Sequence, residues 1–322
     1  MNQAVATSMP VAPGRDAAAE VARVADAVRR RVLAYTLKNN GGYLSQACSS
    51  AETLATLYLR VMRLGESTAP LVPRPFAGVP GPNNPHAFTG ADYNGPRAPD
   101  LDRFIFSPVH YALVLYSVLI ALGRLGPNGL DAFNQDGSTV ELIGAEHSPG
   151  HEVTAGSLAQ ALSQAGGIAL ARKLKGETGR VWVFMSDGEF QEGQTWEAVA
   201  ALAHHRIGNL GVYIDANAQQ CDGAMTDVMT IEPLAARLRA FGADVHEVDG
   251  HDSDALAAPA QGFGSGDRPL AVIARTDPCR GMELMRERTP KLHYLRFKSE
   301  AEIRAYEAQL AAMDAAAAED RA

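Results

Sequence analysis

A short apolar run that ends abruptly in polar residues is the feature that most constrains the fold of this chain. Residues 181–185 are all apolar, and Ser186, Asp187 and Gly188 break the run before a helix-compatible stretch begins near Glu192. This pattern predicts a buried strand, a turn at its carboxyl end and then a helix. A second apolar run, residues 210–214, also ends in polar residues and predicts a second buried strand.

The ends of these two predicted strands supply oxygen-bearing side chains. In open α/β sheets, ligands bind outside the carboxyl ends of the strands, so we expect Asp187 and Asn217 to face a common crevice. Carboxylate, carboxamide and backbone carbonyl oxygens suit Mg²⁺, which takes its remaining ligands from water and substrate phosphates. The sequence therefore predicts a hard-oxygen cation site at this edge of the sheet.

The motif resembles the thiamine diphosphate motif of transketolases, in the amino-terminal, pyrophosphate-binding half of those enzymes. The matching segments are Asp187-Gly188-Glu189, residues 192–197, Asn209-Leu210 and residues 215–223. The resemblance implies an α/β thiamine-diphosphate-binding fold, with a mostly parallel sheet and helices on both faces. It also implies that Asp187, Asn217 and the carbonyl of Gln219 hold Mg²⁺ or another divalent cation. Gly188, Glu189 and Asn217 would then bind the cofactor.

Two further segments extend the resemblance upstream. Residues 102–107 lead to His110 and an apolar run, residues 111–122, for which we expect a buried helix. His110 matches a family histidine that contacts cofactor and substrate. Gly156, Ser157 and Leu158 match a family stretch beside the diphosphate, where a glycine allows close backbone approach. We expect this segment to open a helix that runs to about residue 175, with Thr154 as its cap.

Histidines supply the other candidates for catalysis. Both His147 and His151 are candidates for an upstream family histidine, and His147 is preferred because His151 lies where the family usually has an aliphatic residue. His293 follows the last predicted strand, roughly where transketolases have a substrate-contacting histidine. The catalytic candidates are thus His110, His147 and His293, whereas His251 is expected to cap a helix.

The sequence departs from the family at Tyr43. Alignment backward from residues 49–52 puts Tyr43 in place of the histidine of the family's Gly-His-Pro-Gly loop, before a helix expected over about residues 50–62. A phenol has a pKa near ~10 and stays neutral, so proton transfer there is disfavoured. Its larger ring predicts a substrate outside the ordinary pentose-phosphate intermediates, such as an unphosphorylated or biosynthetic one. In the alternative alignment, Tyr43 packs beneath the loop.

The resemblance covers nearly all of the 322 residues. We interpret residues 1–15 as a disordered lead, 16–316 as one pyrophosphate-binding domain and 317–322 as a tail. Residues 65–100 are dense in Pro, Gly and Asn and predict a long loop that covers the site or touches a partner. The family's activating glutamate lies in a second, pyrimidine-binding domain, and we expect this chain to lack that domain.

The resemblance therefore implies one subunit of a thiamine-diphosphate-dependent, transketolase-like enzyme. Such an enzyme transfers a two-carbon ketol unit from a ketose donor to an aldehyde acceptor. A separately encoded carboxy-terminal subunit would supply the pyrimidine domain, in a heterotetramer. The alternatives are an E1-type subunit that decarboxylates a 2-oxo acid, or a noncatalytic thiamine-diphosphate-binding partner protein. Trp196-Glu197 within the extended motif favours the transketolase reading.

Composition excludes several other functions. The net charge of −8 argues against a general binder of nucleic acid or of anionic membranes, because both need clustered Lys and Arg. The three cysteines are widely spaced and indicate a reducing compartment. Residues 1–14 lack the pattern of a secretory signal, and residues 111–122 are too few to span a bilayer. We therefore expect a cytoplasmic protein.

Overall fold

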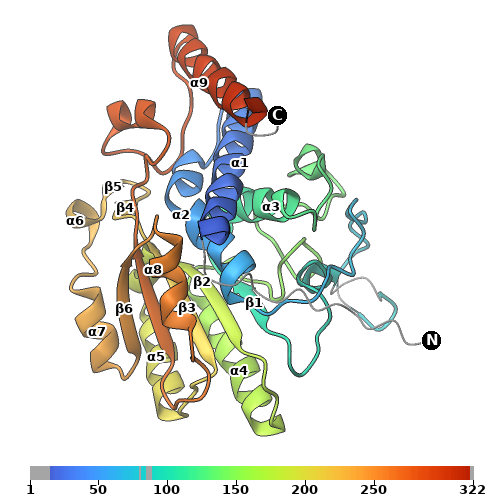
Figure 1. Cartoon of the computed structure of the whole chain (residues 1–322), viewed down its shortest axis with the longest axis vertical. Helices are drawn as coiled ribbons and strands as arrows, with labels where there is room; N and C mark the ends of the chain where they lie inside the picture. The colour runs from blue at the N-terminus through green and yellow to red at the C-terminus, as the bar shows by residue number, and fades with distance from the viewer. Residues whose placement is uncertain (1–14, 80, 85–88, 320–322) are drawn as a thin grey trace.

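A computed structural model describes residues 15–79, 81–84 and 89–319 of the chain. Its main sheet has five strands, all parallel, in the order β1-β2-β3-β7-β6 (Figure 1). The strands are β1 (Arg103–Phe106), β2 (Val181–Ser186), β3 (Leu210–Ala216), β6 (Asp244–Asp249) and β7 (Leu270–Arg275). A two-stranded antiparallel ribbon, β4 (Gln219–Gln220) and β5 (Gly223–Ala224), follows β3. The predicted α/β class with a mostly parallel sheet is confirmed.

Helices cover both faces of this sheet because successive side chains of each strand point to opposite faces. Trp182 and Phe184 belong to the core on one face, and Val183 and Met185 belong to the core on the other. The first face carries α1 (Arg15–Asn39), α2 (Leu44–Thr56), α3 (Ala112–Ala121) and α8 (Ser253–Ala257). The second face carries α4 (Gln160–Lys175), α5 (Gly193–His204) and α7 (Leu234–Ala240).

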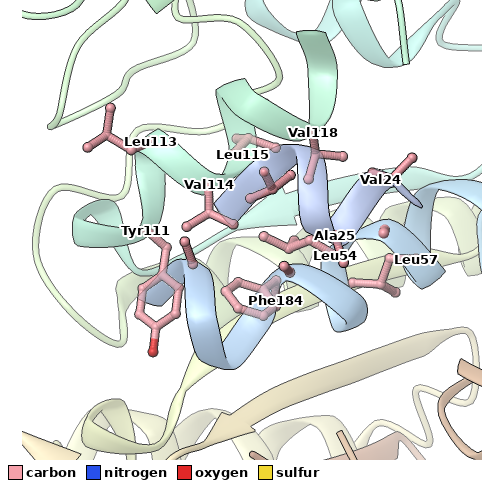
Figure 2. Close-up of a cluster of buried hydrophobic side chains, with 14 of the residues drawn as sticks. Val24, Ala25, Leu54, Leu57, Tyr111, Leu113, Val114, Leu115, Val118 and Phe184 are labelled. Atoms are coloured by element: carbon pink, nitrogen blue, oxygen red, sulfur yellow. The ribbon is translucent and has the colours of Figure 1, made fainter. Parts of the chain in front are cut away.

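Helix α2 is the central element of the first face, and all of its residues are buried. Its Leu54 packs among apolar side chains of α1 and α3, such as Val24 and Val114 (Figure 2). Tyr111 lies at the edge of this cluster, and its hydroxyl oxygen points away from the apolar side chains (Figure 2). This orientation brings a polar group from the helix layer to the carboxyl edge of the sheet.

Several boundaries differ from the predicted ones. Helix α2 begins at Leu44, ahead of the expected start near residue 50, and continues into a π-helical turn, η1 (Leu57–Val61). Helix α4 begins only at Gln160, because Thr154 does not cap it and Ala159 adopts a left-handed conformation with φ of 68°. Strand β1 was not anticipated, since its four residues are too few for a clear pattern.

The carboxyl-terminal helix α9 (Glu300–Glu319) extends into the predicted tail and lies beside α1 (Figure 1). The predicted lead, residues 1–15, falls outside the described residues except for Arg15, which begins α1. The last three residues of the predicted tail also fall outside them. No helix within the described ranges combines the length and the apolarity needed to cross a membrane.

The described residues of the long segment between η1 and β1 are irregular, as predicted, apart from a short 3-10 helix, η2 (Thr89–Asn94). Gly90 holds it against the loop that carries His147: its amide donates to the carbonyl of Glu146 (2.7 Å) and its carbonyl accepts from Gly150 (2.9 Å). A Cβ at Gly90 would lie 2.3 Å from the carbonyl oxygen of Ser148, so only glycine allows this approach. The long segment therefore braces the loop of residues 144–152.

Candidate active site

Strands β2 and β3 bring the predicted metal ligands to one edge of the sheet. Ser186 and Asp215 are paired in register, so the residues that follow each of them emerge side by side. Asp187 begins the 3-10 helix η5 (Asp187–Gln191), and its buried Oδ2 accepts from the amide of Ala218 (2.8 Å). This bond joins the turn after β2 directly to the turn after β3.

A buried carboxylate, Asp215, fixes the position of Asn217. Its Oδ2 accepts from Ser49 (2.6 Å), Tyr111 (2.6 Å) and the Asn217 amide nitrogen (3.1 Å), and its Oδ1 accepts from Thr276 (2.5 Å). Because the amide nitrogen of Asn217 faces Asp215 and Tyr111, its Oδ1 is turned the other way. Burial raises the pKa of Asp215, and these hydrogen bonds oppose the rise. Asp215 was not among the predicted site residues.

The environment of Asp187 fits a divalent cation. Burial, and secondarily the charge of Asp215, raise the pKa of Asp187 to about 8, and no Lys or Arg of the described chain forms an ion pair with it. A cation would supply the missing positive charge. The side-chain Oε1 of Gln219, nearby in sequence to Asn217, is buried and has no hydrogen-bond partner within the described ranges.

The donor set is one carboxylate with neutral oxygens, which suits Mg²⁺. Among the described residues there is no cluster of three or more His, Cys, Asp or Glu that could hold a metal. The assignment of Asp187, Asn217 and Gln219 as ligands stays a prediction.

Glu189 organises the predicted cofactor loop from inside the protein. Its Oε1 accepts from Ser107 and from the amide of Ala159 (2.9 Å), and its Oε2 accepts from the amide of Ser186 (2.9 Å). One buried carboxylate thus ties the ends of β1 and β2 to the start of α4. Its protein partners occupy both oxygens, so any contribution to cofactor binding would come through the loop that it holds.

The predicted diphosphate contacts lie on the exposed rim of the same edge. Gly156, Ser157 and Leu158 are exposed on the loop before α4. A Cβ at Gly188 would lie 2.9 Å from the side-chain nitrogen of Gln220, and one at Gly156 would lie 2.7 Å from Ile143. A side chain at either position would therefore displace a neighbouring side chain, whereas glycine leaves the backbone open to a close approach.

An aromatic cluster stands beside this edge. The His110 and His293 rings are 4.9 Å apart, and Tyr43 lies 5.9 Å from His110 and 5.5 Å from His293. A backbone bridge assembles the cluster, since the amides of Gly42 and Leu295 each donate to the other's carbonyl (3.1 and 3.0 Å). Burial lowers the pKa of His110 to about 3 and also lowers the pKa of His293. Both histidines are therefore neutral at pH 7.

The structure separates the two candidates for the upstream histidine. His147 is 2.7 Å from a carboxylate oxygen of Glu141, and its ring lies 5.0 Å from Phe76 of the long loop. Its ring contacts neither His110 nor His293 among the described residues. His151 is buried in the core, with its Nδ1 3.3 Å from the carbonyl of Pro149 and its Nε2 without a partner in the described chain. Only His147 keeps some exposure.

Buried His151 should make the protein sensitive to acid. Burial lowers its pKa to about 4, whereas an unfolded histidine titrates near ~6.5, so the unfolded chain binds the proton first. Stability should therefore fall as the pH drops from about 6.5 to about 4. We expect His151→Phe to remove roughly 2–3 kcal/mol of that loss, as measured by urea unfolding across this pH range.

Exposed His246 provides the matched control, as His246→Phe. Buried His110 also lowers the stability of every variant in acid, so the comparison is between the slopes of stability against pH. Parallel stability curves for the parent chain and His151→Phe would show that His151 does not carry this linkage.

His251 does not have the role predicted for it. Asp252 caps α8, accepting from the amides of Asp254 (2.8 Å) and Ala255 (3.2 Å). The Nε2 of His251 accepts from the amide of Asp277 (2.8 Å), so its Nδ1 carries the proton and donates to Glu52 (3.1 Å). The expectation that His251 is a helix cap is therefore wrong. The side chain instead anchors the segment after β7 to helix α2.

Sequence comparisons found a matching family and several similar proteins. The family described as transketolase, thiamine diphosphate binding domain, matches residues 86–287. A putative uncharacterized transketolase family protein of Sinorhizobium fredii is 32% identical over 272 residues, which cover 84% of this chain and 88% of that protein. An apulose-4-phosphate transketolase subunit of Actinobacillus succinogenes is 27% identical over 85% of this chain and 90% of that protein.

The fold also matches solved structures. A transketolase from Pichia stipitis superposes with a TM-score of 0.66 at 21% identity, over 93% of this chain. The match covers 45% of the Pichia chain, so this protein spans a little less than half of that enzyme.

Proposed function

Since the chain belongs to the transketolase family, we propose that it is the amino-terminal subunit of a split transketolase, which transfers a two-carbon ketol unit from a ketose to an aldehyde. One observation carries this proposal. The match spans 90% of the apulose-4-phosphate transketolase subunit, but only 45% of the transketolase from Pichia stipitis. A separately encoded subunit with the pyrimidine-binding domain would complete the enzyme, in a cytoplasmic heterotetramer.

In this proposal, the carboxyl edge of the sheet holds the cofactor. When bound, thiamine diphosphate supplies the carbon nucleophile and electron sink needed to break and form a C–C bond beside a carbonyl. Asp187, Asn217 and the carbonyl of Gln219 would hold Mg²⁺, and the backbone at Gly156 and Gly188 would lie against the diphosphate. The cation offsets the charge that burial makes costly at Asp187.

The aromatic cluster would orient the sugar. His110 and His293 are neutral, so each ring has one nitrogen that donates and one that accepts, and a nitrogen without a protein partner could bind a substrate oxygen. The close packing of these rings with Tyr43 limits the space at the donor end of the pocket. His147, on the neighbouring loop of residues 144–152, would be a further catalytic residue.

An activity screen of both subunits together tests the proposal. We expect ketol transfer when the pair is supplied with a ketose donor and an aldehyde acceptor, in the presence of thiamine diphosphate and Mg²⁺. The screen should include sugar phosphates, unphosphorylated ketoses and 2-oxo acids. Decarboxylation of a 2-oxo acid without ketol transfer would favour the E1-type alternative, and no turnover of any substrate would favour the noncatalytic one.

Tyr43 should determine which ketoses the enzyme accepts. Burial raises the pKa of its phenol, so Tyr43 is a neutral group where the family has a histidine. We expect the reconstituted pair to use xylulose 5-phosphate with ribose 5-phosphate at least about tenfold less efficiently than its own substrates, a difference of ~1.4 kcal/mol in transition-state binding. Steady-state kcat/KM values for the two substrate sets measure this preference.

Tyr43→Phe is the diagnostic variant. It keeps the ring and removes the hydroxyl, so a changed ratio between the two substrate sets would show that the hydroxyl takes part in recognition. Efficient use of the pentose phosphates that is unaffected by Tyr43→Phe would contradict the specificity argument, while leaving the family assignment intact.

A further inference from the structure

A buried glutamine lies against the backbone and ring of His293. Gln46 is on the first turn of helix α2 and is 2% exposed. Its Nε2 is 3.2 Å from the carbonyl oxygen of His293 and 3.4 Å from the Nδ1 of the same residue. Its Oε1 accepts from the hydroxyl of Ser45 (2.9 Å), which is also buried.

These contacts fix the orientation of the Gln46 amide. A carbonyl oxygen can only accept, so the atom of Gln46 that faces the carbonyl of His293 must be the amide nitrogen. With the amide in this orientation, its other end accepts from the hydroxyl of Ser45. Gln46 therefore presents only N–H groups to His293.

The amide orientation in turn determines the protonation of the imidazole. Because Gln46 offers an N–H to Nδ1, that nitrogen must accept, and the single proton of a neutral imidazole must lie on Nε2. A doubly protonated ring would place an N–H of His293 against the N–H of Gln46. Among the described residues, no protein group forms a hydrogen bond with Nε2 of His293. The Nε2–H is thus left for a ligand.

We propose that Gln46 is a positioning residue that keeps His293 in the neutral, Nε2-protonated tautomer, so that His293 presents a hydrogen-bond donor to an oxygen of the substrate. The proposal rests on the proposed transferase function. The Gly42–Leu295 bridge holds the two segments in register, and the contacts of His293 with His110 and Tyr43 place its ring within the aromatic cluster. Gln46 acts only through His293.

Nitrogen NMR of the full-length chain labelled in its histidines tests the tautomer directly. The signals of His293 are identified by their loss in His293→Gln. At pH 7.5 we expect a protonated Nε2 and an unprotonated Nδ1. A proton on Nδ1, or on both nitrogens, overturns the proposal. This measurement needs neither the partner protein nor a substrate.

Two variants of Gln46 separate positioning from packing. Gln46→Glu has nearly the same shape but offers only acceptors, so it should draw a proton to Nδ1 and move the titration of His293 upward by at least about one pH unit. Gln46→Met fills a similar volume without a donor, so the Nδ1-protonated tautomer should appear. Gln135→Met, on an exposed loop, is the matched control. Unchanged His293 signals in both Gln46 variants overturn the proposal.

Kinetics of the reconstituted pair provide the functional readout. We expect the acid limb of kcat/KM in Gln46→Glu to move to higher pH with the titration of His293, and kcat/KM of Gln46→Met to fall about tenfold at pH 7.5. A pH profile in Gln46→Glu that coincides with the parent profile overturns the role in catalysis. If the parent pair shows no ketol transfer while the NMR result holds, the proposed function fails and the tautomer assignment stands.

Discussion

Asp187→Ala is expected to weaken the Mg²⁺-dependent binding of thiamine diphosphate by at least about 100-fold. Loss of a group that merely orients a metal ligand already costs about 10- to 100-fold, and Asp187 is the only carboxylate in the proposed ligand set. Asn217→Ala should have an effect of the same order, since it removes a second oxygen. Calorimetric titration of the complete chain with cofactor, at fixed Mg²⁺, measures both changes.

The fold should survive these substitutions. The carboxylate of Asp187 is buried near Asp215, which raises its pKa and makes its charged form costly in the absence of a cation. Circular dichroism should therefore be unchanged in Asp187→Ala. Asp227→Ala, on an exposed position of α6 (Met225–Val228), serves as the control. Parent-like cofactor affinity in both Asp187→Ala and Asn217→Ala would place the cation elsewhere.

The purified chain without its partner should show at least about 100-fold less ketol transfer than the reconstituted pair. The family's activating glutamate belongs to the pyrimidine-binding domain, and a positioned acid or base contributes about 10²- to 10⁴-fold to a reaction. A titration of this chain with the partner, at saturating cofactor and Mg²⁺, should give activity that rises and then saturates at a fixed ratio of subunits.

Two controls make the result interpretable. Asp187→Ala mixed with the partner should stay inactive, which shows that the activity depends on the site in this chain. The partner alone should also be inactive. Full ketol transfer by the single chain would rule out the split enzyme.

The sequence predicted the elements whose signals are local. Strands β2 and β3 begin at their predicted residues and extend only one or two residues beyond their predicted ends. Buried strands of a parallel sheet are continuous apolar runs, and the polar residues that follow them mark their carboxyl ends. The neighbouring positions of the turns that carry Asp187 and Asn217 could be predicted for the same reason.

Contacts between distant segments could not be predicted. His251 was expected to cap a helix because it precedes one, but its partners Glu52 and Asp277 come from α2 and from the segment after β7. No sequence pattern marked Gln46 as a site residue. Its role becomes visible only when the fold places His293 beside this buried glutamine. The start of α4 was missed because the left-handed conformation of Ala159 has no sequence signature.

The Gly42–Leu295 bridge also determines when the aromatic cluster can form during synthesis of the chain. It joins two segments separated by most of the chain, and closing so long a loop costs conformational entropy that later contacts must offset. The ribosome delivers helices α1 and α2 first, so Tyr43 and Gln46 are made long before His293. A nascent chain halted before that histidine lacks one wall of the aromatic cluster. Any ligand binding that depends on the complete cluster therefore has to wait until His293 has been translated.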